Sequence, residues 1–222
     1  MIEPDVWPKM SEVKVVSLDM EGTLIDHAFS HAIWETDIPR LYAEKHGLDL
    51  ESAREMVLAE YSTIGESRRE WYDVDYWFRR LGLDADWRQL IRERVGLITV
   101  YPDAAEALER LSGVYPMIVS SNTIREFLDL QVDAVGHYFT HVYSAPSDFG
   151  TVKKDAGFYR LIIGALGVRP GEMVHVGDHP EFDYRAARCL GVRAYHLNRS
   201  NGAAGRDTIH NLVELISLLV DP

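Results

Sequence analysis

Short apolar runs that stop at small polar or acidic residues predict the strands of this chain. Three runs and the residues that follow them are 13–18 before Asp19, 117–119 before Ser120-Ser121-Asn122, and 173–176 before Gly177-Asp178. Residues 192–197 and the stretch around Val142 and Tyr143 predict two more strands. Their β-branched content and length are typical of strands buried inside a sheet.

Segments with a helical period separate these strands. Ala104, Ala107, Leu108 and Leu111 follow the i, i+3, i+4, i+7 spacing, and Asp103 is a reasonable N-cap. The same spacing begins again at Phe158 and at Leu212. Alternating strands and helices predict an α/β fold: a Rossmann-like three-layer α/β/α core around a parallel sheet. Ligands bind such sheets beyond the carboxyl ends of the strands, where Asp19, Ser121 and Asp178 fall.

Residues 27–97 have a different pattern, with helical periodicity and no convincing strand. They contain four of the five tryptophans, and Pro39 is expected to kink or restart a helix. We therefore expect an inserted α-helical domain at 27–97, with the core formed by 1–26 and 98–222. The tryptophans are expected mainly to form the core of this insertion, although some could line a pocket.

Composition restricts the partners. With 23 basic and 35 acidic residues the net charge is −12, which disfavours binding to nucleic acid or to an anionic membrane. The single cysteine, Cys189, cannot form an internal disulfide. No apolar run is long enough to span a bilayer, and residues 1–10 do not resemble a signal peptide. A cytoplasmic protein is expected, and its oligomeric state stays open.

Acidic residues at two strand ends suggest the chemistry. Asp19, at the end of the first strand, can act as a nucleophile toward phosphorus, and Glu21 can transfer protons on the same side. Asp178 and Asp183, five residues apart, can serve a hard cation such as Mg²⁺. Taken singly, each acid could equally be a turn or helix-capping residue.

Basic and hydroxyl groups at the other strand ends complete the set. Lys153 or Lys154 could offset the negative charge and contact a phosphate. Ser121 and Asn122 could hold phosphate oxygens. Each lysine alone is more typical of a solvated surface, and Ser121-Asn122 could simply cap a helix.

The order of these four elements resembles the haloacid dehalogenase-like (HAD) hydrolase superfamily, whose members are mostly Mg²⁺-dependent phosphatases. The resemblance covers residues 12–26 and 98–200. Its four motifs correspond to Asp19-x-Glu21-Gly22-Thr23-Leu24, Ser121-Asn122, Gly150-x-x-Lys153, and Gly177-Asp178-x4-Asp183. The helical insertion is similar to the family's cap domain, which closes over the site and selects the substrate.

The resemblance implies a role for each residue. Asp19 would be the nucleophile, and Glu21 the general acid/base that also lends its backbone carbonyl to Mg²⁺. Ser121, Asn122 and Lys153 would bind the phosphoryl group. Lys153 is preferred because Lys154 occupies the family's usual proline position. Asp178 would be a metal ligand and Asp183 would support it.

One departure from the family pattern concerns Glu21, where aspartate is usual. The longer side chain must fold back to reach the same place. Enolase-phosphatases of methionine salvage have a similar first motif, but the third and fourth motifs show no close match to them. Their substrate is therefore not carried over.

The prediction is thus a Mg²⁺-dependent phosphatase that hydrolyses a small phosphorylated metabolite through an aspartyl-phosphate. A phosphomutase, a hydrolytic dehalogenase, or a non-catalytic phosphate-binding protein with a degenerate site are the alternatives. Arg68 and Arg69 could contact an acidic substrate or lie in solvent. His27 and His31, just past the first motif, are more often exposed or capping residues than substrate contacts.

Overall fold

The computed structural model describes residues 12–200 and 205–220 of the chain, so residues 1–10 lie outside the described part. Its centre is a parallel six-stranded sheet with the order β3-β2-β1-β4-β5-β6. The strands are β1 (Val15–Leu18), β2 (Met117–Ser121), β3 (Phe139–Ser144), β4 (Met173–Gly177), β5 (Arg193–Leu197) and β6 (Thr208–Ile209). The α/β class is therefore confirmed.

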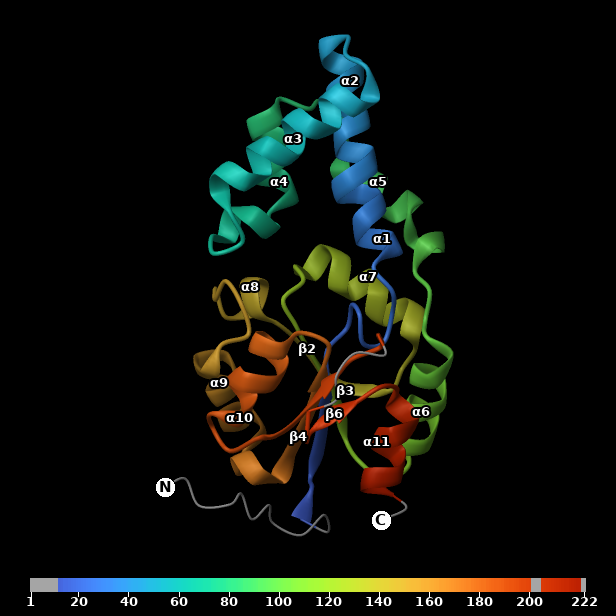
Figure 1. Ribbon diagram of the computed structural model, residues 1–222, viewed down its shortest axis with the longest axis vertical. Coiled ribbons are helices and arrows are strands. Elements are labelled where there is room, and N and C mark those ends of the chain that lie inside the picture. The colour runs from blue at the N-terminus through green and yellow to red at the C-terminus, as the bar shows by residue number, and fades with distance from the viewer. Residues whose placement is uncertain (1–11, 201–204, 221–222) are drawn as a thin grey trace.

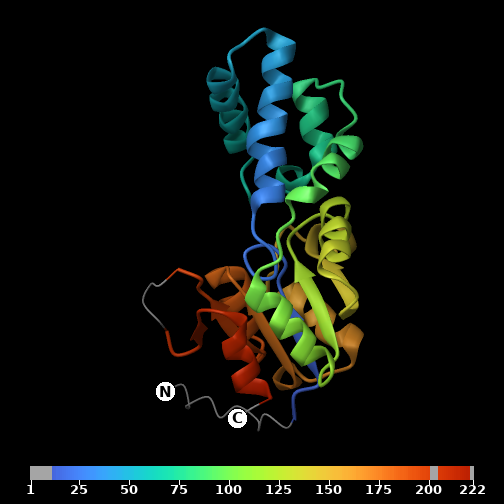
Figure 2. The same cartoon turned by 90° about the vertical axis from the view of Figure 1, so that its right-hand side faces the viewer.

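Helices cover both faces of the sheet (Figures 1 and 2). On one face, apolar side chains of β1, β2 and β4 pack against α6 (Pro102–Ser112), α7 (Arg125–Val135) and α11 (Leu212–Leu219). On the other face they pack against α9 (Ala156–Leu166), α10 (Ala186–Arg188) and the first residue of α8 (Ala145–Asp148). The central strands are buried along their whole length, because both of their faces meet a helix layer.

The structure corrects two details of the sequence analysis. The short edge strand β6 was not predicted, since two residues carry no periodic signal. Asp103 is not the N-cap of α6: Tyr101 holds that position without a side-chain hydrogen bond. The Asp103 carboxylate instead accepts hydrogen bonds from Arg199 and from the backbone N–H of Leu212. It therefore ties α6 to α11 and to the loop after β5.

Residues 28–97 form a group of helices above the sheet, which we call the helical module (Figure 1). Its elements are α1 (Ala28–His31), a π-helical turn (Ala32–Asp37), α2 (Ile38–His46), α3 (Leu50–Ile64), a 3₁₀ turn (Arg69–Tyr72), α4 (Val74–Leu81), α5 (Trp87–Glu93) and a second 3₁₀ turn (Val95–Leu97). A separate apolar cluster holds them together, with Trp77 fully buried in it. The division into two domains at 27–97 stays a prediction.

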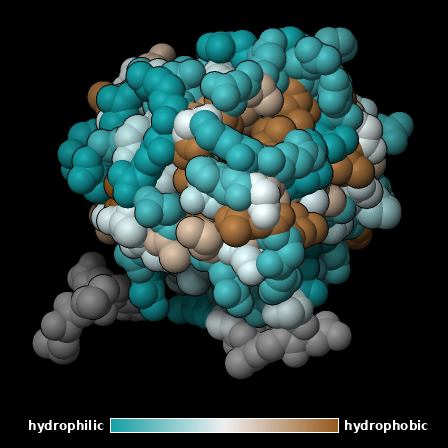
Figure 3. All heavy atoms as spheres, turned by 90° about the horizontal axis from the view of Figure 1, so that it is seen from above, coloured by the Kyte–Doolittle hydropathy of each residue, from teal (hydrophilic) through white to brown (hydrophobic). Residues whose placement is uncertain are grey.

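The expected disturbance at Pro39 is visible as the wide π-helical turn that runs directly into α2. Proline removes a backbone donor from a helix interior, so the turn before it widens. Seen from the module end, the surface is mainly hydrophilic with scattered hydrophobic patches (Figure 3). Large apolar side chains exposed near the α2–α3 turn include Leu48, Leu50 and Met56.

Candidate active site

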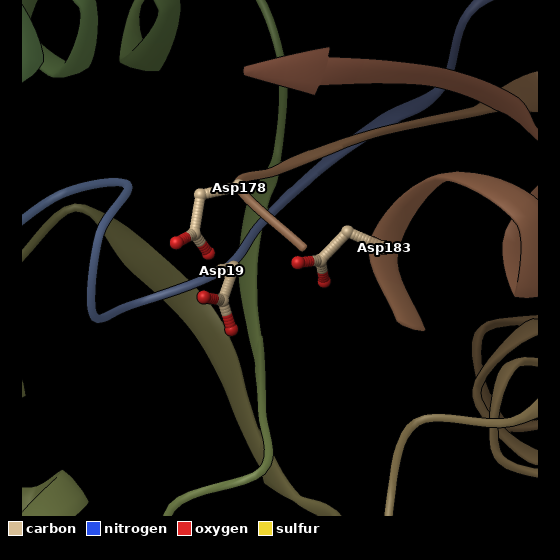
Figure 4. Close-up of side chains that lie close together, drawn as sticks. All are labelled: Asp19, Asp178 and Asp183. Atoms are coloured by element: carbon tan, nitrogen blue, oxygen red, sulfur yellow. The ribbon is translucent and has the colours of Figure 1, made fainter. Parts of the chain in front are cut away.

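Three aspartates meet at the carboxyl ends of the central strands (Figure 4). Asp19 follows β1, Asp178 follows β4, and Asp183 lies in the π-helical turn Pro180–Arg185. One carboxylate oxygen of each lies within 4.8 Å of the others. The reason is the register of the sheet, in which Leu18 pairs with Val176 so that β1 and β4 end side by side. Asp19 and Asp178 were expected at this edge of the sheet, and Asp183 joins them from the turn that follows β4.

A buried lysine lies among the aspartates, and it is Lys154. Its ammonium group donates hydrogen bonds to Asp19 Oδ1 and to the backbone carbonyl of Ser120, at 3.2 Å for the latter, and lies 2.5 Å from Asp183 Oδ1. The side chain is only 2% exposed. The backbone N–H of Lys154 donates to Asn122 Oδ1 at 2.7 Å, which fixes its loop against the end of β2. Asn122 therefore places the lysine.

We expected Lys153 beside Asp19 from the sequence, but in the structure the next residue, Lys154, lies there. Lys153 Nζ lies 3.0 Å from Glu66 of the helical module and 4.2 Å from the centre of the Phe182 ring. Adjacent residues on an irregular loop point in different directions. Asp155 follows the two lysines and caps α9 by accepting the N–H of Phe158.

Burial and like charge shape the ionisation of the aspartates. Burial, with the charges of Asp183 and Asp178, raises the pKa of Asp19 well above its usual range although Lys154 opposes this. Burial and Asp183 also raise the pKa of Asp178. Burial acts in the same direction on Asp183, but Lys154 and His175 outweigh it and lower the pKa of that carboxyl. One ammonium faces three carboxylates, so the cluster has an excess of negative charge that a cation would offset.

The oxygen atoms that remain available suggest how a cation would be held. Asp183 uses Oδ1 for Lys154 and His175, and its Oδ2 accepts the N–H of His179 at 2.9 Å. Among the described residues, the Asp19 carboxylate is bonded through Oδ1 alone, to Lys154. Asp178 Oδ2 is 3.9 Å from the imidazole of His27. Asp19 and Asp178 are therefore suited to direct coordination, and Asp183 to holding the surrounding groups in place.

A layer of buried polar groups supports the aspartates from below. His175 on β4 is fully buried, with Nε2 3.0 Å from Asp183 Oδ1 and Nδ1 2.8 Å from the hydroxyl of Ser17. A carboxylate only accepts hydrogen bonds, so Nε2 carries the proton and Nδ1 accepts from Ser17. The Ser17 hydroxyl is 2.8 Å from that of Ser120. Burial lowers the pKa of His175, which favours the neutral form of the ring.

Glu21 lies outside the three-aspartate group. Its Oε1 accepts a 2.6 Å hydrogen bond from Gln131 on α7, and its Oε2 is 3.7 Å from His27 Nδ1. Gln131 is fully buried. The nearby Glu21 carboxylate raises the pKa of His27, although burial opposes this. These contacts fix the longer glutamate side chain, whose carboxylate was expected to need such folding back.

The first motif turns sharply at Gly22, where φ is +75°. A Cβ atom here would lie 2.3 Å from Asp178 Oδ2 and 3.0 Å from His27 Nε2. Glycine is therefore required both by the backbone conformation and by the close approach of the acidic cluster. At the end of β2, the Ser121 hydroxyl accepts the N–H of Thr123, and its side chain is nearly buried.

A pocket of about 480 Å³ lies between the helical module and the segment that runs from the end of β2 into α7. Glu21 and Asn122 form part of its wall. Arg68 and Arg69 line a separate cleft, and Arg68 pairs with Glu70 at 2.6 Å. The structure does not bring these arginines into the pocket next to Glu21.

The fold and this site define a hydrolase with carboxylates at the ends of parallel strands. The family model of haloacid dehalogenase-like hydrolases matches residues 13–191, so the chain belongs to the haloacid dehalogenase-like hydrolase family. The resemblance drawn from the four motifs is confirmed, and so is the prediction of a hydrolase. In the described part of the chain, no helix is long and apolar enough to cross a membrane.

Individual relatives cover nearly the whole chain. The GMP/IMP nucleotidase YrfG of Escherichia coli is 26% identical over 87% of this chain and 86% of its own length. The enolase-phosphatase E1 of Sorangium cellulosum is 30% identical over 90% of this chain and 94% of its own. The crystal structure of a HAD phosphatase from Thermococcus onnurineus is similar with a TM-score of 0.79 at 26% identity, covering 94% and 98% of the two chains.

Several residues of the site were not identified from the sequence. Gln131 and His175 lie inside a helix and a strand, where a polar residue gives no local signal of what it contacts. Lys154 is a candidate from the sequence, but the family pattern favours Lys153 as the phosphate-binding lysine. The sequence does indicate that His175 has hydrogen-bond partners, since a histidine inside an otherwise apolar strand must find them when it is buried, but it does not indicate which groups they are.

Proposed function

We propose that this protein is a Mg²⁺-dependent phosphatase that hydrolyses a small phosphorylated metabolite through an aspartyl-phosphate on Asp19. The observation that carries the proposal is the meeting of Asp19, Asp178 and Asp183 around the buried ammonium of Lys154. The relatives support it, because one is named a nucleotidase and another a phosphatase. These two relatives are named for different substrates, so they do not indicate which metabolite this protein hydrolyses.

In the proposed first step, a carboxylate oxygen of Asp19 attacks phosphorus and the bond from phosphorus to the leaving oxygen breaks. Glu21 gives its proton to that oxygen, which leaves as an alcohol. In the second step Glu21 takes a proton from water as the water oxygen attacks phosphorus. Inorganic phosphate leaves and the Asp19 carboxylate is restored. Gln131, bonded to Glu21, holds the carboxyl that moves these protons.

The phosphoryl oxygens need positive charge and hydrogen-bond donors, and the chain supplies both. Lys154 replaces Lys153 in this role because its ammonium group is bonded to Asp19, whereas Lys153 pairs with Glu66. Ser121 and Asn122 at the end of β2 are proposed to complete the phosphate site. Mg²⁺, when bound to Asp19 and Asp178, would neutralise charge on the phosphate. The backbone carbonyl of Glu21 is the proposed third protein ligand.

Phosphate release from a panel of monophosphate esters, with and without Mg²⁺, tests the proposal. We expect Mg²⁺-dependent release that Asp19→Asn abolishes. Asp26→Asn is the matched control, because Asp26 lies on the same segment and accepts the N–H of Ala28, a role that asparagine fills equally well. In Glu21→Gln, a phosphorylated enzyme should accumulate and be visible by intact-protein mass spectrometry.

Other outcomes would replace the proposal. Halide release without Mg²⁺ would identify a dehalogenase, and isomerisation of a sugar phosphate that needs a bisphosphate activator would identify a mutase. Binding of Mg²⁺ and phosphate with no turnover of any ester would identify a binding protein. A calorimetric titration with Mg²⁺ adds a readout independent of activity, and Asp178→Asn should weaken it.

A further inference from the structure

The pocket beside Glu21 has an unusual wall, formed largely by aromatic side chains. Trp34, Tyr61, Trp71, Tyr72 and Phe127 all face it. The Tyr61 ring packs edge-on against Trp34 and Trp71, and Trp34 also contacts Phe127. The tryptophans of the insertion therefore do both: some form its core and others line a pocket. Trp77 is buried in the module core, whereas Trp34 and Trp71 are partly exposed in this pocket.

The pocket is continuous with the proposed phosphate site. Asn122 belongs to both, since it lines the pocket and accepts a hydrogen bond from the backbone N–H of Lys154, and the proposed proton donor Glu21 also lines the pocket. A molecule with its phosphoryl group at Asp19 would therefore extend its leaving group into this space. A volume of about 480 Å³ is within the usual range for small-molecule sites.

Most polar side chains of the wall already have partners within the chain. The hydroxyl groups donate to backbone carbonyls: Ser30 to His27, Ser62 to Leu58, Tyr61 to Trp34, and Tyr72 to Glu66. Those groups can still accept a hydrogen bond, but they are not free donors. Flat apolar surface is therefore the main feature that the wall offers to a ligand.

Charge adds a second preference. Glu35 lines the pocket, with Oε2 bonded to Arg54 at 2.9 Å and Oε1 3.9 Å from His31, beyond hydrogen-bond distance. Its negative charge also affects Tyr61 in the pocket wall, because burial chiefly, and then the charge of Glu35, raise the pKa of the Tyr61 hydroxyl. Within the described chain, the residues lining the pocket include no lysine or arginine. An anionic leaving group would thus meet a carboxylate, whereas an N–H donor would find an acceptor.

Resting on the proposed phosphatase function, we infer that the substrate is a phosphate monoester whose leaving group carries a flat, uncharged nitrogen heterocycle with an N–H donor, as in a nucleoside monophosphate. The ring would stack among Trp34, Tyr61 and Trp71, and its N–H edge would point to Glu35. The phosphoryl group would lie at Asp19. Stacking of bases on aromatic side chains is strong enough to dominate such a choice.

Matched substrates separate the ring from the phosphate. Ribose 5-phosphate, purine riboside 5′-monophosphate and inosine 5′-monophosphate share the same kind of leaving oxygen. The second adds a ring, and the third adds to that ring an N–H donor and the neighbouring carbonyl. We expect kcat/KM for purine riboside monophosphate to exceed that for ribose 5-phosphate by roughly tenfold or more. The kcat/KM for inosine monophosphate should be higher again by roughly tenfold or more, which is the contribution of one hydrogen bond to a charged acceptor.

Pocket variants locate these two preferences. Trp34→Leu and Trp71→Leu should reduce the preference for the ring, while the hydrogen bonds to their backbone carbonyls are kept. Tyr42→Leu is the control, since the Tyr42 ring contacts His46 elsewhere in the module and does not line this pocket. Glu35→Gln should reduce only the preference for inosine monophosphate. Glu44→Gln, which alters a surface pair with Arg40, should leave it unchanged.

The outcomes distinguish this inference from the proposed function. Equal kcat/KM for ribose 5-phosphate and purine riboside monophosphate would overturn the ring-binding pocket while leaving the phosphatase intact. Equal values for the two nucleotides would overturn the role of Glu35. If no ester released phosphate, the proposed function would fail. Calorimetric binding of inosine, lost in Trp71→Leu but kept in Tyr42→Leu, would then still support the pocket, and absence of binding would overturn it.

Discussion

Replacing Lys154 with methionine tests the charge balance of the site directly. The lysine side chain is 2% exposed, and the side chains of Asp19 and Asp183 beside it are 9% and 0% exposed. Methionine fills a similar volume but leaves two buried carboxylates without their counter-charge. Removing one partner of a buried ion pair destabilises a protein by about 3–5 kcal/mol. At about 2–4 °C for each kcal/mol in a chain of this size, the midpoint of thermal unfolding should fall by roughly 10 °C.

Lys153→Met is the matched control, because it makes the same chemical change one residue earlier. Lys153 is 15% exposed and its partner Glu66 is 69% exposed, so solvent screens the pair. Such surface pairs contribute about 0–1 kcal/mol. We therefore expect the two variants to differ by about 3 kcal/mol in the free energy of unfolding, although both lose one positive charge.

Urea unfolding at several pH values, in EDTA, provides the assay. Lys154 lowers the pKa of Asp183 in the folded protein, so the stability from this contact is present above the unfolded-state pKa. It is lost as the pH falls and the carboxyl becomes protonated. The gap between wild type and Lys154→Met should therefore be largest at neutral pH and shrink in acid.

Three results would refute this reasoning. Equal stability of the two lysine variants would show that Lys154 is not the counter-charge of the cluster. A gap independent of pH would indicate lost packing in place of unpaired charge. Full phosphatase activity in Lys154→Met would remove the lysine from the phosphate site, where its loss should lower kcat by about a hundredfold or more.

Three further changes test other parts of the structure. Gly22→Ala should unfold at a lower urea concentration than Gly47→Ala. Both glycines have positive φ, but only at Gly22 would the new Cβ overlap the acidic cluster, so equal unfolding midpoints would contradict the close approach. Gln131→Met should lower kcat with little change in KM, because Glu21 loses its hydrogen bond; an unchanged kcat in steady-state assays would exclude this positioning. Arg169 lowers the pKa of Glu172 to about 2, so this contact should stabilise the fold above the unfolded-state pKa and lose its effect as the pH falls toward 2. Glu172→Gln should therefore flatten that part of the acid-unfolding curve, and an unaltered curve would contradict the assignment.

The sequence determined the architecture because the periodicity of its elements reflects which faces are buried. Apolar runs such as 173–176 lie in strands covered on both faces, and the polar residues that follow them mark the edge where ligands bind. Asp19, Ser121 and Asp178 could be expected to lie near one another for this reason alone. Their order along the chain, together with the other motifs, was enough to indicate the family.

Only the tertiary structure decided which of two adjacent lysines turns inward, because loop direction depends on contacts that are distant in sequence, such as Asn122 with Lys154. It also decided the supports of Glu21 and Asp183, since Gln131 and His175 belong to elements whose local sequence does not reveal what they face. The aromatic pocket is likewise a product of folding. Residues from the helical module and from α7 come together in its wall, and that proximity is set by the packing of the module against the core.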